Sequence, residues 1–253
     1  MAQPRALVLR APGTNCDEET AHAWEKAGAA VEVLHVHRLL ESPGYLASFQ
    51  VLTIPGGFSY GDDLGAGRIL AARLGALADV LRDFHERGGL TLGICNGFQV
   101  LVKAGLLPGR AIKATITHND SGHYETRWVR LATHSGVGPF VVDDEPIELP
   151  SAHGEGKFLT ASERDLTTLE AAGQVVFRYI DDQGRPTETF PANPNGSPRG
   201  VAGLCDPTGR ILGLMPHPER FIDPLQHPQW TRRPSANEGD GLRLFRNAVA
   251  ALR

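Results

Sequence analysis

The sequence predicts an α/β fold, in which helices flank a mostly parallel central sheet that carries additional antiparallel strands. The first half of the chain alternates apolar, strand-like runs with stretches of helical spacing, which is typical of a covered parallel sheet. The second half changes to short β-like runs between turns, so we expect antiparallel strands that extend the sheet or lie across its face. A single domain over 1–253 is the simplest division, although two small domains would also fit the length.

The elements of the first half follow from apolar spacing and from the Gly and Pro residues that end each run. The expected strands cover 5–10, 31–36, 50–54 and 90–94, and the expected helices cover 17–27, 64–87 and 98–104. Thr14 or Asn15 is expected to cap the first helix. Because ligands bind beyond the carboxyl ends of parallel strands, the segments 12–15 and 56–57 should share one sheet edge with Cys95.

The second half is expected to be rich in short strands. These strands should cover 111–117, 124–133, 146–151, 174–180, 201–205 and 211–215. The Asp- and Gly-containing segments 181–184 and 206–209 have the composition of hairpin turns. The Pro-rich segments 191–198 and 223–237 should be loops, and the amphipathic stretch 238–252 should form a closing helix.

Composition and charge argue against several classes of function. A net charge of −4 without a basic block makes nucleic acid a poor partner hypothesis. No apolar run of about 18 residues and no signal peptide stands out, so a membrane or secreted fate has no support. Three scattered cysteines do not form a disulfide framework, which fits a reducing, cytoplasmic compartment. The ten histidines lack metal-ligand spacing, so we expect no metal site.

The segment 93–97, Gly-Ile-Cys-Asn-Gly, carries the strongest chemical signal in the chain. It follows an apolar run and precedes a helical pattern, the strand–turn–helix arrangement in which α/β hydrolytic enzymes present a nucleophile. Gly93 and Gly97 remove Cβ atoms from a tight turn, and the helix N-terminus favours the thiolate form of Cys95. A buried, inert thiol is the commoner fate of an isolated cysteine, but this spacing favours a nucleophile.

A cysteine nucleophile needs a base, and the segment 215–220, Met-Pro-His-Pro-Glu-Arg, supplies a candidate. Pro218 favours an extended conformation at His217, and residues two apart in extended chain face the same way. Glu219 could therefore orient the imidazole as the third member of a triad. Taken alone, a solvated loop histidine beside a surface glutamate is an equally good interpretation, but the nucleophile turn upstream favours the triad.

Other polar groups fall near the nucleophile in this scheme. The backbone amides of Asn96 and of Gly57, in a Pro-Gly-Gly loop, are candidates for an oxyanion hole, although that loop could be only a turn. Gln99 lies one helical turn after the nucleophile, where its amide would recognise an amide-bearing substrate or be satisfied within the protein. The loop 152–156, Ala-His-Gly-Glu-Gly, would hold an amino-acid head group or merely turn the chain.

Together these segments resemble the class I (triad) glutamine amidotransferases. The segments 93–99 and 215–220 carry the resemblance, and 55–62, 152–156 and 193–198 narrow it to the glutaminase components of phosphoribosylformylglycinamidine (FGAM) synthases. The similarity covers nearly the whole chain, from residue 12 to the last helix. It implies a flavodoxin-like arrangement of the predicted sheet.

The resemblance also implies a reaction. Cys95 would attack the side-chain amide of L-glutamine, releasing ammonia and leaving a γ-glutamyl thioester that water hydrolyses to glutamate. His217 would shuttle the protons, and Glu219 would position it. The side chains expected to contact the substrate are Phe58, Gln99, His153 and Glu155.

The resemblance implies partners as well. The ammonia would pass to a separate PurL-like synthetase subunit, which uses ATP to convert formylglycinamide ribonucleotide to FGAM in purine synthesis. A small PurS-like accessory subunit would join them. ATP and Mg²⁺ are expected only on the synthetase, so this chain should bind no cofactor. The segments 63–65 and 221–237 look closer to the glutaminase domains of large fused enzymes, which leaves the docking surface open.

Two rival functions fit parts of the pattern. Another class I amidotransferase or a free γ-glutamyl hydrolase would share the nucleophile turn, but the residues of 58–62 and 153–156 argue against both. A non-catalytic, amidotransferase-like binding module should have lost a triad member, and all three are present. We also expect low glutaminase activity until a partner docks, because the Gly-rich loop 56–67 could be ordered by docking.

Overall fold

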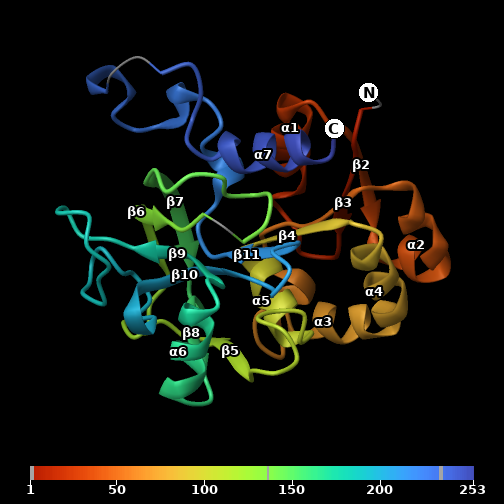
Figure 1. Ribbon diagram of the computed structural model, residues 1–253, viewed down its shortest axis with the longest axis horizontal. Coiled ribbons are helices and arrows are strands. Elements are labelled where there is room, and N and C mark those ends of the chain that lie inside the picture. Colours follow the sequence, from red (N-terminus) through yellow and green to blue (C-terminus); the bar gives the residue numbers. More distant parts are fainter. Residues whose placement is uncertain (1–2, 136, 234–235) are drawn as a thin grey trace.

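The computed structural model describes residues 3–135, 137–233 and 236–253. Within these residues, nine strands form one mixed sheet at the centre of the molecule, in the order β2-β1-β3-β4-β11-β10-β9-β6-β7 (Figure 1). These strands are β1 (Arg5–Arg10), β2 (Ala30–His35), β3 (Val51–Ile54), β4 (Leu90–Ile94), β6 (Glu125–Thr133), β7 (Ile147–His153), β9 (Val175–Tyr179), β10 (Val201–Cys205) and β11 (Ile211–Leu214). A separate two-stranded sheet pairs β5 (Ala114–Thr117) with β8 (Lys157–Thr160).

Parallel pairing joins β2, β1, β3, β4 and β11, and antiparallel pairing adds β10, β9, β6 and β7 to that group. Most strands of the second half therefore extend the sheet, which is one of the two arrangements expected for them. The mixed sheet and its flanking helices confirm the predicted α/β class.

Helices cover both sides of the parallel strands (Figure 1). They are α1 (Asp17–Ala27), α2 (Val36–Glu41), α3 (Arg68–Leu74), α4 (Ala78–Glu86), α5 (Asn96–Lys103), α6 (Glu163–Ala171) and α7 (Leu242–Ala251). Helices α1 and α7 pack together on one side of the parallel strands, whereas α3 and α5 pack together on the other. The antiparallel end of the sheet carries α6 and the β5–β8 pair.

Trp24 shows how α1 is fixed to the sheet. Its ring meets that of Phe245 in α7 edge to face, with 4.9 Å between the ring centroids. Its indole N–H donates to the hydroxyl of Thr53 in β3 at 2.8 Å. Because a buried indole needs a hydrogen-bond acceptor, this single contact sets both the depth and the rotation of α1 on the sheet.

The expected helix over 64–87 is wrong as one continuous element. It begins at Arg68, after Gly67 with a φ of 72°, and a short 3-10 turn, Gly75–Leu77, separates α3 from α4. Glycine is a poor helix former, which explains the late start. The break falls at Leu77, whose φ of −104° and ψ of 11° lie outside helical geometry. The first helix has the predicted bounds, but its N-cap is Cys16 rather than Thr14 or Asn15.

Most other predicted bounds differ by a few residues. The closing helix begins at Leu242 instead of 238, and Val36 opens α2 instead of ending a strand. The helices α2 and α6 and the strand β8 were not expected. The segment 191–198 is a loop, as predicted. The segment 223–237 is irregular with two 3-10 turns, and its residues 234–235 lie outside the described residues.

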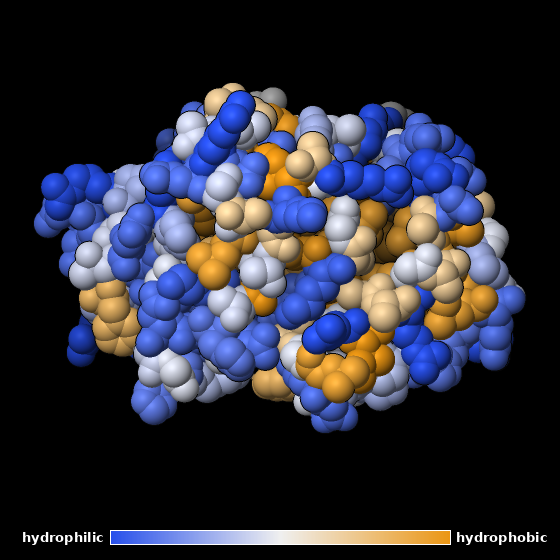
Figure 2. Space-filling view, turned by 90° about the horizontal axis from the view of Figure 1, so that it is seen from below, coloured by the Kyte–Doolittle hydropathy of each residue, from blue (hydrophilic) through white to orange (hydrophobic). Residues whose placement is uncertain are grey.

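The face shown in Figure 2 is mostly hydrophilic, with hydrophobic side chains in separate patches. In the described part of the chain, no helix combines the length and the apolar character that crossing a bilayer requires.

Candidate active site

Cys95 lies at the turn between β4 and α5, as the strand–turn–helix pattern predicts. Its φ of 50° is in the left-handed region, which costs a non-glycine residue roughly 1–3 kcal/mol. A Cβ on Gly97 would lie 1.8 Å from the carbonyl oxygen of Ile54, and one on Gly93 would lie 2.5 Å from Leu101 Cδ1. Both glycines therefore let α5 approach the strands closely, which confirms the steric role predicted for them.

His217 follows β11, the neighbour of β4, and so reaches the same sheet edge as Cys95. Its Nδ1 lies 2.6 Å from Glu219 Oε1, and both side chains are buried. The expected contact is present, and His217 is extended as predicted, with φ of −106° and ψ of 91°. The extended chain does not continue to Glu219, which lies in the 3-10 turn Pro218–Arg220. A carboxylate accepts a hydrogen bond, so Nδ1 donates to Glu219. Nε2 has no hydrogen-bond partner among the described residues.

The pKa values of two buried histidines near Cys95, His217 and His153, shift in opposite directions. Burial by itself would lower the pKa of His217, but Glu219 and then Cys95 outweigh it and raise the pKa well above its ordinary value. Burial and repulsion from His217 lower the pKa of His153 to about 4. His217 is therefore suited to carry a proton, whereas His153 stays neutral.

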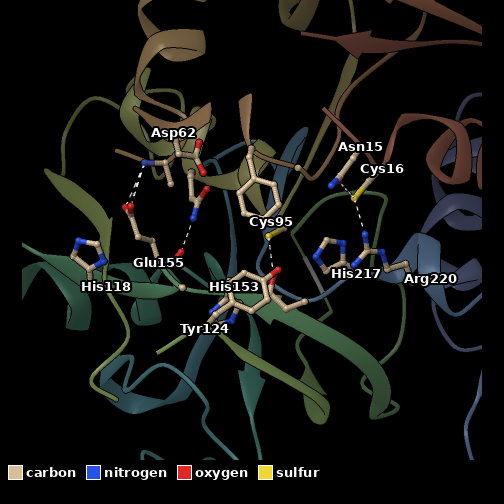
Figure 3. Close-up of a pocket in the computed structure, with 16 residues that line it drawn as sticks. Asn15, Cys16, Asp62, Cys95, His118, Tyr124, His153, Glu155, His217 and Arg220 are labelled. Carbon is tan, nitrogen blue, oxygen red and sulfur yellow. Dashed lines mark hydrogen bonds between the residues drawn. The ribbon is translucent and has the colours of Figure 1, made fainter. Parts of the chain in front are cut away.

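A cavity of about 230 Å³ contains both Cys95 and His217 (Figure 3). Asp62 and Glu155 lie at one end of the view, Cys16 lies at the other, and Cys95 lies between them. The cavity wall comes from the segments that follow β1, β3, β4 and β11, from the end of β7 with the loop after it, and from the connection between β5 and β6. The loops predicted to share one sheet edge do so, because they follow neighbouring parallel strands.

The two candidate oxyanion donors lie beside the nucleophile. Asn96 is the buried first residue of α5, where backbone N–H groups have no acceptor within the helix. Gly57 lines the cavity with a φ of 136°, and a Cβ there would lie 2.8 Å from the backbone nitrogen of Asn15. Only glycine fits this position without strain. The oxyanion role of both amides stays a prediction.

All four side chains expected to contact substrate belong to residues that line the cavity: Phe58, Gln99, His153 and Glu155. Phe58 is half-exposed at the rim, with its ring 6.3 Å from that of Tyr124. Gln99 already has protein partners at both ends of its amide. Its Oε1 accepts from Asn96 at 2.9 Å, and its Nε2 donates to the backbone oxygen of Glu155. The contacts present are those of the alternative interpretation, a glutamine satisfied within the protein.

The imidazole of His153 is also engaged inside the protein. Its Nδ1 lies 3.1 Å from Asn119 Oδ1, which also accepts from the backbone N–H of Gly156. A Cβ on Gly156 would lie 2.3 Å from the imidazole, so the loop packs directly against the ring. His153 therefore shapes the 153–156 loop, and its contact with substrate stays a prediction.

Cys16 is a cavity residue to which sequence reasoning assigned no chemistry. Its thiol lies 3.2 Å from Asn15 Oδ1, and its sulfur accepts from Arg220 Nη2 at 3.0 Å. Burial raises the pKa of Cys16, although His217 and Arg220 act in the opposite direction. Its place after the first strand, at the shared sheet edge, indicates that it lies near the site, but no pattern in the sequence gives it a role. Tyr124, beside the end of β7, carried no such signal.

One group of side chains has the donor types of a metal site. The possible ligand atoms of Cys16, His217 and Glu219 all lie within 4.8 Å of one another. The surroundings fit a cation poorly, because the Arg220 guanidinium already contacts the Cys16 sulfur and Glu219 already holds His217 Nδ1. These side chains are better suited to holding an imidazolium than to ligating a metal.

Residues 3–250 match the family described as the CobB/CobQ-like glutamine amidotransferase domain. The chain is 47% identical to phosphoribosylformylglycinamidine synthase subunit PurQ of Dehalococcoides mccartyi, over 98% of both chains. It is 39% identical to the subunit of that name from Methanococcus maripaludis, over 97% of this chain and 96% of the relative. Its fold is similar to the structure of PurLQS from Thermotoga maritima, with a TM-score of 0.75 and 30% identity over 100% of both chains.

Proposed function

The chain belongs to the PurQ family of FGAM synthase subunits, and we propose on that premise that it releases ammonia from L-glutamine for a synthetase. The observation that carries the proposal is the buried His217–Glu219 pair, which shares a cavity with Cys95 at a strained strand-to-helix turn. A nucleophile, a base and an orienting carboxylate are the parts that acyl transfer from an amide requires.

In the first half of the reaction, the Cys95 thiol passes its proton to His217 Nε2, and the resulting thiolate attacks the side-chain carbonyl carbon of glutamine. The carbonyl electrons move to oxygen, to which the amides of Asn96 and Gly57 would donate hydrogen bonds. When the tetrahedral intermediate collapses, His217 gives its Nε2 proton to the departing nitrogen. Ammonia leaves, and a γ-glutamyl thioester remains on Cys95.

In the second half, water replaces ammonia. His217 Nε2 removes a proton from the water molecule while the oxygen attacks the thioester carbonyl. The C–S bond breaks, glutamate departs and the thiolate is regenerated. Glu219 accepts a hydrogen bond from Nδ1 throughout, which fixes the ring orientation and stabilises its charged form.

The cavity also suggests how glutamine lies. His217 and Cys16 occupy one end and Cys95 the middle, so the amino-acid head group points toward Asp62 and Glu155 (Figure 3). The carboxylates at that end suit the α-ammonium group of the substrate. Phe58 and Gln99 would contact the aliphatic part of the chain between the two ends.

The partners follow from the family. The ammonia passes to a PurL-like synthetase, and a small PurS-like subunit completes the complex, as the name of the similar PurLQS structure suggests. ATP and Mg²⁺ belong to the synthetase, so this chain works without a cofactor of its own. The reaction takes place in the cytoplasm, and glutamine hydrolysis stays slow until the synthetase docks. Equal glutamine turnover with and without the synthetase would overturn the expectation that hydrolysis stays slow before docking.

The decisive experiment measures FGAM formation by the reconstituted complex, with either glutamine or ammonium chloride as the nitrogen source. A Cys95→Ala subunit should abolish the glutamine-dependent reaction and leave the ammonium-dependent reaction intact. Cys205→Ala is the matched control, because Cys205 is buried in β10 and does not line the cavity. Retained glutamine-dependent synthesis with Cys95→Ala would exclude the mechanism. Glutamine hydrolysis that never supports FGAM formation would favour a free hydrolase.

A further inference from the structure

One face of α5 carries a row of polar side chains toward the cavity. Gln99 follows Asn96 by three residues and Lys103 follows Gln99 by four, a spacing that places all three on the same side of a helix. Asn96 contacts the segment after β3, Gln99 contacts the segment after β7 and Lys103 contacts both, and the mechanism above uses none of these side-chain contacts. The row therefore ties α5 to the walls of the cavity.

The first wall is the loop after β3. Asn96 Oδ1 accepts from the backbone N–H of Ser59 at 3.2 Å, and Asn96 Nδ2 donates to Asp62 Oδ1 at 3.2 Å. The loop needs such support, because Tyr60 and Asp62 both have positive φ, of 55° and 53°. At the far end of the loop, Lys103 Nζ donates to the backbone oxygen of Ala66.

The second wall is the loop after β7, and Lys103 reaches it as well. Its Nζ lies 3.8 Å from Glu155 Oε2, while Gln99 Nε2 donates to the backbone oxygen of Glu155. The backbone N–H of Ala66 points back to the same carboxylate, 3.3 Å from Oε1. Ala66, Glu155 and Lys103 thus form a closed ring of contacts that joins α5 to both loops.

We propose that Lys103 is a positioning residue for glutamine, which locks the Ala66 and Glu155 loops together at the head-group end of the cavity. The proposal rests on the proposed glutaminase function. Lys103 and Glu155 are each only about a fifth exposed, at 19% and 20%, so their attraction is little screened by solvent. Lys103 itself does not line the cavity, and so it acts through its two partners.

The place of this ring determines which kinetic constant should change. In Figure 3, Glu155 lies on the far side of Cys95 from His217, away from the reacting atoms. Loosening the loops there weakens binding of the ground state and the transition state alike. Such a change raises KM and leaves kcat nearly unaltered, whereas loss of a group that acts on the reacting amide would lower kcat.

The test measures steady-state glutamine hydrolysis by the assembled complex. Lys103→Met should raise KM for glutamine about tenfold while kcat changes less than about threefold. Lys113→Met is the matched control, because Lys113 is exposed and does not line the cavity. Lys103→Arg keeps the charge and should recover most of the affinity. An unchanged KM in Lys103→Met, or a loss confined to kcat, would overturn the proposal.

A double-mutant cycle separates positioning from general loosening of the fold. Lys103→Met and Glu155→Gln break the same ring, so their combined effect on KM should be well below the product of the two single effects. Independent, multiplicative effects would overturn the proposal. If Lys103→Met does not fold, Lys103→Gln gives the same comparison. Failure of the proposed function would appear differently, as activity that survives Cys95→Ala.

Discussion

The substitution Gly97→Ala is a demanding test of the nucleophile turn, because the backbone of Gly97 packs directly against the backbone of β3. The added Cβ would lie 1.8 Å from the carbonyl oxygen of Ile54 and 2.7 Å from its carbonyl carbon. Real Cβ atoms essentially never come within 3.0 Å of such a neighbour. Both contact atoms belong to the backbone of β3, so no side-chain rotation relieves the clash. The start of α5 must move away from the sheet by more than about 1 Å.

The cost of this displacement in stability and in turnover can be estimated. Overpacking a rigid core costs about 1–3 kcal/mol, and a backbone clash of this size belongs at the upper end. A loss of about 3 kcal/mol lowers the melting temperature by about 6–12 °C in a protein of this length. Because Cys95 lies two residues before Gly97, the nucleophile moves as well, and a misplacement of about 1 Å costs about 10²-fold in turnover.

Thermal unfolding and glutamine hydrolysis measured on the same preparations check both expectations. Gly75→Ala is the matched control, because Gly75 has helical φ and ψ of −55° and −32° and its Cβ would meet nothing within 4 Å. That change should be neutral or stabilise by about 0.4–1 kcal/mol. A Gly97→Ala protein with wild-type melting temperature and turnover would refute the close-packing account of the turn.

Two further substitutions test the site. Glu219→Gln removes the carboxylate that raises the pKa of His217, so the imidazole should titrate at lower pH by NMR and kcat should fall about 10²–10⁴-fold. A kcat within threefold of wild type would contradict the triad. Asn96→Ala leaves the buried Ser59 N–H without its acceptor and removes one of the two donors to Asp62 Oδ1, the other being the Gly67 N–H, so urea denaturation should show a loss of about 1–3 kcal/mol. An unchanged midpoint would show that this side chain does not support the loop.

Features that depend on local spacing were predictable from the sequence. The strands β1 and β10 and the helix α1 have the predicted bounds, because apolar periodicity and a following turn signal fix each of them locally. The turn at Cys95 and the His217–Glu219 contact were also found, since glycine spacing and a His-Pro-Glu sequence place these groups with few alternatives. The resemblance to a known family then supplied their roles.

Features that depend on contacts between distant segments were not predictable. Cys16 and Arg220 are 204 positions apart, and no local pattern shows that the arginine meets the sulfur. The expected caps Thr14 and Asn15 instead make local contacts, in which Thr14 Oγ1 accepts from the Ala11 N–H and Asn15 Oδ1 lies beside the Cys16 thiol. The sequence shows Lys103 only as a basic residue near a helix end, and its contacts with Ala66 and Glu155 appear only in the folded structure.

The central claim is that one sulfur, that of Cys95, attacks glutamine. Mass spectrometry after treatment with a diazo or chloroketone analogue of glutamine tests it most directly. Cys16 lines the same cavity, so the experiment needs both the wild-type and the Cys16→Ala protein. We expect a single adduct, on Cys95, in both proteins. An adduct on Cys16, or full labelling of a Cys95→Ala protein, would contradict it.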